Sequence, residues 1–121
     1  MRINEITTTT ITAGAVLTPL LTYPLPGGVG GLLHCRVTAK NTATGRCANT
    51  IVDFGAQNLA GVAAILGTPA IGLSIANGSD AAMALVLVTV SVSGGNVVIN
   101  GTGLAATNIQ WTCSLGPAVH A

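Results

Sequence analysis

Charged residues are scarce in this sequence of 121 residues. Four Lys or Arg and three Asp or Glu make up 6% of it, and the formal net charge is +1. An ordinary soluble domain carries about 25% charged residues, which keep protein surfaces apart in solution. The scarcity therefore predicts that sister subunits or a larger assembly cover much of this surface. The cations form no basic cluster, which argues against nucleic acid as a partner; they are Arg2, Arg36, Lys40 and Arg46.

Aromatic residues are almost absent, since Tyr23, Phe54 and Trp111 are the only three. The core must therefore consist of Val, Ile, Leu and Ala side chains. The mean hydropathy of +0.71 raises the question of a membrane protein. The uncharged stretch 59–76 has about the 18 residues of a membrane-spanning helix. However, it contains three glycines and a proline and has no flanking Lys or Arg, so we expect no membrane partner.

We also expect no signal peptide, because the first residues show no basic segment followed by an apolar one. Its three cysteines, Cys35, Cys47 and Cys113, are odd in number and widely spaced, which fits neither a disulfide framework nor a zinc motif. We expect all three to be free thiols on strands, as is usual for a protein made in a reducing cytoplasm. A bridge between Cys35 and Cys47 is the alternative.

Groups for catalysis are few. The acids are Glu5, Asp53 and Asp80, and the histidines are His34 and His120. His34 and Asp53 are expected to meet across a hairpin, but a His–Asp pair without a nucleophile is typical of a structural contact. The glycine clusters precede strands and lack the Gly-Lys-Ser/Thr of a phosphate loop. We therefore expect no enzyme, no catalytic residue, no metal site and no cofactor.

Apolar and polar residues alternate with a period of two in several segments, which is typical of half-buried strands. Leu33, Cys35, Val37 and Ala39 share one face of a first strand, and a second strand runs from Arg46 to Phe54. The segment 55–72 is rich in Gly and Ala and stays ambiguous, and 71–76 looks like a strand. Further strands are predicted at 83–92, 97–100 and 107–115, with Ser93–Asn96 and 101–103 as turns. This succession predicts an all-β fold, a single antiparallel β-sandwich or jelly-roll-like domain over 32–121.

Residues 1–31 are interpreted as an extended N-terminal arm followed by a Gly-rich hinge. Three prolines lie at positions 19, 24 and 26, and four glycines between positions 27 and 31. The alternative is that Ala15–Tyr23 is an edge strand of the domain. The arm and the apolar face at 85–87 are the predicted interaction sites, with the residues Ile6, Ile11, Val16, Leu17, Leu20, Leu21, Tyr23, Leu85 and Leu87.

Two segments carry a resemblance to a known family. The first is a polar strand at 35–40, a Thr44-Gly45 turn and a return strand at 48–54. The second is a Val-rich strand at 97–103, followed by the Trp-containing strand 108–113. In these features the part from Leu32 to the end resembles a β-sandwich domain of tailed-phage virion proteins, of the capsid cement/decoration or tail-fibre type. The resemblance implies a sandwich that forms trimers on particles, and it implies no catalytic residues.

From this resemblance and the apolar composition we expect a structural virion protein of a bacteriophage. The favoured role is that of a capsid cement or decoration protein on the capsid exterior. Such a protein stabilises the head by binding over junctions of the major capsid protein. Its expected partners are itself, as a homotrimer, and the major capsid protein. The alternative is a tail-fibre or head-fibre component that binds the host surface, and a small membrane protein is a third candidate.

Overall fold

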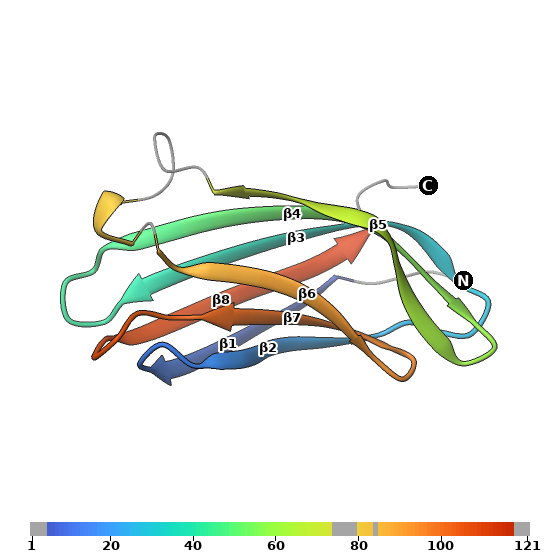
Figure 1. Ribbon diagram of the computed structural model, residues 1–121, viewed down its shortest axis with the longest axis horizontal. Helices are drawn as coiled ribbons and strands as arrows, with labels where there is room; N and C mark the ends of the chain where they lie inside the picture. Colours follow the sequence, from blue (N-terminus) through green and yellow to red (C-terminus); the bar gives the residue numbers. More distant parts are fainter. Residues whose placement is uncertain (1–4, 74–79, 84, 118–121) are drawn as a thin grey trace.

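The computed structural model describes residues 5–73, 80–83 and 85–117. Within them the chain forms two antiparallel sheets that pack face to face (Figure 1). The larger sheet has the order β1-β8-β3-β4-β5, and the smaller has the order β2-β7-β6. The strands are β1 Ile6–Ala13, β2 Leu17–Pro24, β3 Gly30–Asn41, β4 Cys47–Leu59, β5 Val62–Leu73, β6 Leu87–Ser93, β7 Asn96–Thr102 and β8 Asn108–Pro117. The predicted all-β sandwich is confirmed.

The period-two alternation sets the inner face of the larger sheet. In β3 the side chains of Leu33, Cys35, Val37 and Ala39 are buried, as predicted. Ala48, Thr50, Val52 and Phe54 are buried in β4, and Ile109, Trp111, Cys113 and Leu115 are buried in β8. Because these strands are neighbours and their buried residues lie in register, they form one continuous apolar layer that faces the smaller sheet.

The N-terminal segment is part of the sandwich. β1 pairs along its whole length with β8, from Ile6 opposite Leu115 to Ala13 opposite Asn108. β2 pairs with β7 in the other sheet, so the chain crosses from one layer to the other between the two strands. The interpretation of residues 1–31 as a free arm and hinge is corrected here for the described residues. β2 covers 17–24 and lies at the edge of the smaller sheet, as in the alternative interpretation. Its Leu20, Leu21 and Tyr23 side chains belong to the core.

The predicted Gly-rich hinge is a turn fixed by Asn58. This residue is 3% exposed, and its side-chain amide donates a hydrogen bond to the Leu25 carbonyl at 2.6 Å. Its backbone N–H donates to the Val29 carbonyl and its own carbonyl accepts from Gly28 N–H, both at 2.9 Å. A single buried side chain therefore ties the end of β4 to the connection between β2 and β3.

The ambiguous middle segment is the second half of a long hairpin. β4 and β5 are joined through Ala60 and Gly61, whose φ angles of 55° and 86° are both positive. Two positive φ angles are typical of the type I′ turn, whose twist matches that of antiparallel strands. β5 ends at Leu73, so residues 74–76 of the strand predicted at 71–76 lie outside the described residues.

The strand predicted to begin at Met83 begins at Leu87 instead. Residues Ala81–Met83 form one turn of 3-10 helix, in which the Asp80 carboxylate accepts a hydrogen bond from Ala82 N–H at 2.9 Å. Met83 is 1% exposed and packs in the core from this turn. Residue type alone does not distinguish such a turn from the start of a strand. The predicted Ser93–Asn96 turn is confirmed, whereas Gly101 and Thr102 belong to β7.

Gly101 in β7 packs closely against Leu20 and against Trp111 of the larger sheet. A Cβ atom placed there would lie 2.8 Å from Leu20 Cδ1 and 2.9 Å from two ring atoms of Trp111. We expect Gly101→Ala to lower the free energy of unfolding by about 1–3 kcal/mol, the usual cost of overpacking a core. Gly31→Ala is the matched control, since a Cβ there meets nothing within 4 Å. Thermal unfolding of both variants checks this; equal melting temperatures would contradict the close packing.

Candidate interaction surfaces

An apolar row lies across one end of the smaller sheet. Leu17 in β2 and Leu87 in β6 are both opposite Thr102 in β7, so all three side chains project from the same outer face. Leu17 is 59% exposed and Leu87 is 52% exposed. Val16 and Leu85 continue the row just before each strand and are 62% and 85% exposed. We call Val16, Leu17, Leu85 and Leu87 the Leu17–Leu87 row.

The smaller sheet is also uncharged. The sequences of β2, β6 and β7 are LTPLLTYP, LVTVSVS and NVVINGT, which contain no Asp, Glu, Lys or Arg. Its outer face combines the row with small polar side chains from Thr, Ser and Asn. A surface of this kind has no charge to lose when it is covered, so the desolvation cost of burying it is low.

A second exposed apolar group lies at the β4–β5 end of the larger sheet. Leu59 and Val62 are directly paired beside the turn, and each is 63% exposed. Leu66 lies over Gly55, with its Cβ 3.5 Å from the position of a glycine Cβ, and Leu32 is opposite Gly55 on the other side. Sequence analysis missed these residues. The segment 59–66 shows no alternation of apolar and polar side chains that could have indicated which of them are exposed.

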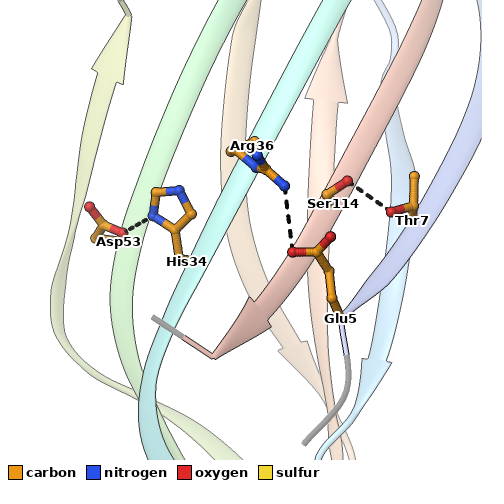
Figure 2. Close-up of polar contacts among 6 residues, drawn as sticks. All are labelled: Glu5, Thr7, His34, Arg36, Asp53 and Ser114. Carbon is orange, nitrogen blue, oxygen red and sulfur yellow. Dashed lines mark hydrogen bonds and ion pairs between the residues drawn. The ribbon is translucent and has the colours of Figure 1, made fainter. Parts of the chain in front are cut away.

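Besides its exposed apolar residues, the outer face of the larger sheet carries polar and charged side chains, and Figure 2 shows six of the polar and charged residues in this region. His34 Nδ1 and Asp53 Oδ1 are hydrogen-bonded at 2.5 Å across β3 and β4, as predicted. Arg36 donates to the Glu5 carboxylate at 3.5 Å.

The hydroxyls of Thr7 and Ser114 are bonded at 2.9 Å between β1 and β8. The side chains of the His34–Asp53 and Arg36–Glu5 contacts are one-third or more exposed, so each contact contributes little to stability. These contacts therefore leave polar groups at the surface and add little to the free energy of unfolding.

The structure divides the nine predicted interaction residues into three groups. Leu20, Leu21 and Tyr23 are at most 4% exposed and lie in the core, so their assignment to an interaction surface is corrected. Burial raises the pKa of the Tyr23 hydroxyl above its ordinary value, as befits a core side chain. Ile6 is partly buried against the core, and Ile11 is 69% exposed on the outer face of β1. The remaining four form the Leu17–Leu87 row.

Within the described residues, no three His, Cys, Asp or Glu side chains are placed to hold a metal ion. The structure shows Cys35, Cys47 and Cys113 as free cysteines, with Cys35 and Cys113 buried. Among the same residues no helix is long and apolar enough to cross a membrane.

No protein-family model matches the chain, and no curated protein sequence matches it. Several solved structures match the chain. The tailspike protein of Acinetobacter baumannii phage AM24 matches with a TM-score of 0.50 and 10% identity, over 98% of this chain and 26% of that one. This fold resembles part of a phage tailspike protein. The likeness supports the predicted resemblance to domains of tailed-phage virion proteins at the level of the fold, and this chain spans about a quarter of the AM24 protein.

A second tailspike structure corrects one expectation. The tailspike of Acinetobacter baumannii bacteriophage Fri1 is described as a capsular polysaccharide depolymerase. It matches with a TM-score of 0.42 and 16% identity, over 97% of this chain and 18% of that one. The prediction that the chain is not an enzyme is contradicted by this finding. The prediction rested on the scarcity of catalytic side chains in this sequence.

Proposed function

We propose that this chain is a β-sandwich module of a tail-fibre or tailspike-type component in a tailed-bacteriophage virion. The likeness to the AM24 tailspike, which covers nearly the whole of this chain, is the observation that carries the proposal. This replaces the capsid cement role as the favoured interpretation, because a tailspike is a part of the tail. The partners we propose are further copies of the chain and the host surface that the virion contacts.

The two faces of the sandwich suit different partners. The uncharged outer face of the smaller sheet, with the Leu17–Leu87 row, faces sister subunits in a homotrimer. The outer face of the larger sheet, which carries exposed acids, bases and hydroxyls, faces outward. The division follows from physical chemistry, since covering leucines is favourable by about 25 cal/mol per Å² and covering unpaired charges is costly.

The double variant Leu17→Asp/Leu87→Asp tests the subunit contact. We expect the wild-type chain at micromolar concentration to have about three times the mass of the 11.9 kDa monomer. We expect the variant to be monomeric, because six carboxylates would be desolvated in the trimer. Light scattering coupled to size-exclusion chromatography gives both masses.

Leu59→Asp is the matched control for this test. Leu59 is 63% exposed, similar to Leu17, but it lies near the β6–β7 turn at the opposite end of the smaller sheet. The control should keep the mass of the wild type. A wild-type chain that is monomeric, or a double variant that stays trimeric, would contradict the assignment of the row.

The place of the module in the particle is tested by gold-labelled antibodies against this chain on virions of the phage that encodes it. Labelling at the tail is expected. Labelling spread over the head would contradict the tail assignment and favour the cement interpretation. Labelling confined to a few points on the head would favour a head fibre.

A further inference from the structure

Cys35 and Cys113 are in contact inside the sandwich. Both are 0% exposed, and they lie on the neighbouring strands β3 and β8 with their side chains in the core. Cys35 is opposite Leu115 and Cys113 is opposite Val37, so the two cysteines are diagonal neighbours across the strand pair. Their Sγ atoms are 3.8 Å apart, although the residues are 78 positions apart in the chain.

The third cysteine is far from this pair. Cys47 is opposite Lys40, whereas Cys35 is opposite Val52, five residues further along β4. Five residues of strand correspond to about 17 Å. Cys47 lies half-buried at the β3–β4 turn, where its Sγ donates to the Gly45 carbonyl at 3.5 Å. The alternative bridge between Cys35 and Cys47 is therefore incompatible with this fold, and only Cys35 and Cys113 are neighbours.

We propose that Cys35 and Cys113 are a cryptic disulfide pair, reduced while the chain folds in the host cytoplasm and joined once the assembled protein meets an oxidant outside the cell. The two sulfurs must come closer by about 1.8 Å to reach the length of an S–S bond. Side-chain rotation and a small shift of adjacent strands supply that movement. The proposal concerns the core of the chain and does not depend on the module's place in the virion.

The chemistry is a two-electron oxidation. The thiolate of one cysteine attacks an azo or disulfide oxidant and forms a covalent adduct through sulfur. The second thiolate then attacks that sulfur, forms the S–S bond and expels the reduced oxidant. With the azo compound diamide, the two thiol protons and two electrons end on its nitrogens, which gives the hydrazine.

Burial of the two cysteines makes formation of the disulfide slow. The hydrogen bond to Cys113, together with burial and the charge of that neighbour, raises the pKa of Cys35 far above its ordinary value. The Cys35 thiolate is scarce while the core is closed, and an oxidant reaches either sulfur only when the sandwich opens locally. The pair therefore escapes oxidation during brief exposure and closes over hours.

Once closed, the bond would link β3 to β8 across a loop that contains most of the domain. A cross-link over so long a loop restricts the unfolded chain strongly. We expect oxidation to raise the melting temperature by on the order of 10 °C, and a reducing agent to reverse the rise.

The test is oxidation of the purified, folded chain with diamide for one day, followed by intact-mass and peptide mapping. Cys47→Ser is used as the background, so that only the buried pair can react. The expected product is a monomeric chain that has lost two hydrogens and yields one cross-linked peptide containing Cys35 and Cys113. Cys35→Ala and Cys113→Ala in the same background should give no such product and no rise in melting temperature.

A control for access of the oxidant to the buried thiols is the same oxidation at a urea concentration just below the unfolding transition. Local opening of the sandwich is frequent there. If both thiols are still reduced there, or are capped by separate adducts, the geometry does not support a bond and the proposal is wrong. A cross-link that forms without any rise in melting temperature would contradict the stabilising role.

Discussion

Deletion of residues 1–26 is expected to abolish the cooperative unfolding transition of this protein. The deletion removes β1 and β2, and with them the buried side chains of Leu20, Leu21, Tyr23 and Leu25. Full burial of one large apolar side chain contributes about 1.5–3 kcal/mol. Four such losses approach or exceed the total of about 5–15 kcal/mol that stabilises a domain. The deletion also leaves β7 and β8 without a strand on one side.

Far-UV circular dichroism during heating measures this effect. The full-length Thr9→Ser variant is the control, because Thr9 in β1 is exposed and its replacement should leave the transition unchanged. A truncated chain that still unfolds cooperatively would show that residues 27–121 fold alone. The assignment of β1 and β2 to the core would then be wrong.

Replacement of Trp111 by Ala is expected to lower the free energy of unfolding by about 3–5 kcal/mol, as for other buried aromatic residues. Trp111 is 0% exposed, and its indole N–H donates a buried hydrogen bond to the Thr12 hydroxyl at 2.8 Å. The substitution leaves a cavity between the sheets and removes the donor for Thr12. For a domain of this size the melting temperature should fall by on the order of 10–20 °C.

Trp111→Phe separates the two contributions. Phenylalanine fills most of the volume but donates no hydrogen bond, so its effect should be clearly smaller than that of alanine. Chemical denaturation, followed by circular dichroism because the only tryptophan is lost, gives the free energies. An alanine variant as stable as the wild type would exclude Trp111 from the core.

The larger sheet could be predicted from sequence where alternation was strict. Residues 33–39 and 109–115 alternate without interruption, and each buried residue there was assigned to the correct face. Pairing of β3 with β4 followed from the turn residues 41–45, which set the register that brings His34 opposite Asp53.

The places of β1 and β2 in the sheets could not be predicted, because they depend on contacts between residues far apart in the sequence. In β1 threonines occupy both faces of the strand, so residue type does not distinguish the buried face from the exposed one. The buried face follows only from the pairing with β8. In β2 a bulge between Pro19 and Leu21 brings two successive leucines into the core and breaks the period of two. Prolines there indicated an extended course, which is equally true of an arm and of an edge strand.

The candidate interaction surface was found only in part for the same reason. Leu85 and Leu87 were recognised because they are apolar on the face opposite to Val86 and Val88. Their proximity to Leu17 requires β7 to lie between β2 and β6, with Thr102 opposite both leucines. That pairing joins residues from both ends of the chain, so only the three-dimensional fold brings the row together.

The copy number of this chain in purified virions tests the tail assignment most directly. Quantitative mass spectrometry against isotope-labelled peptides of this chain and of the major capsid protein gives the ratio. A module of a tail fibre or tailspike should be present in small multiples of three, far below the number of major capsid subunits. A ratio near one chain for every one or few capsid subunits would contradict the proposal and return the protein to the capsid surface.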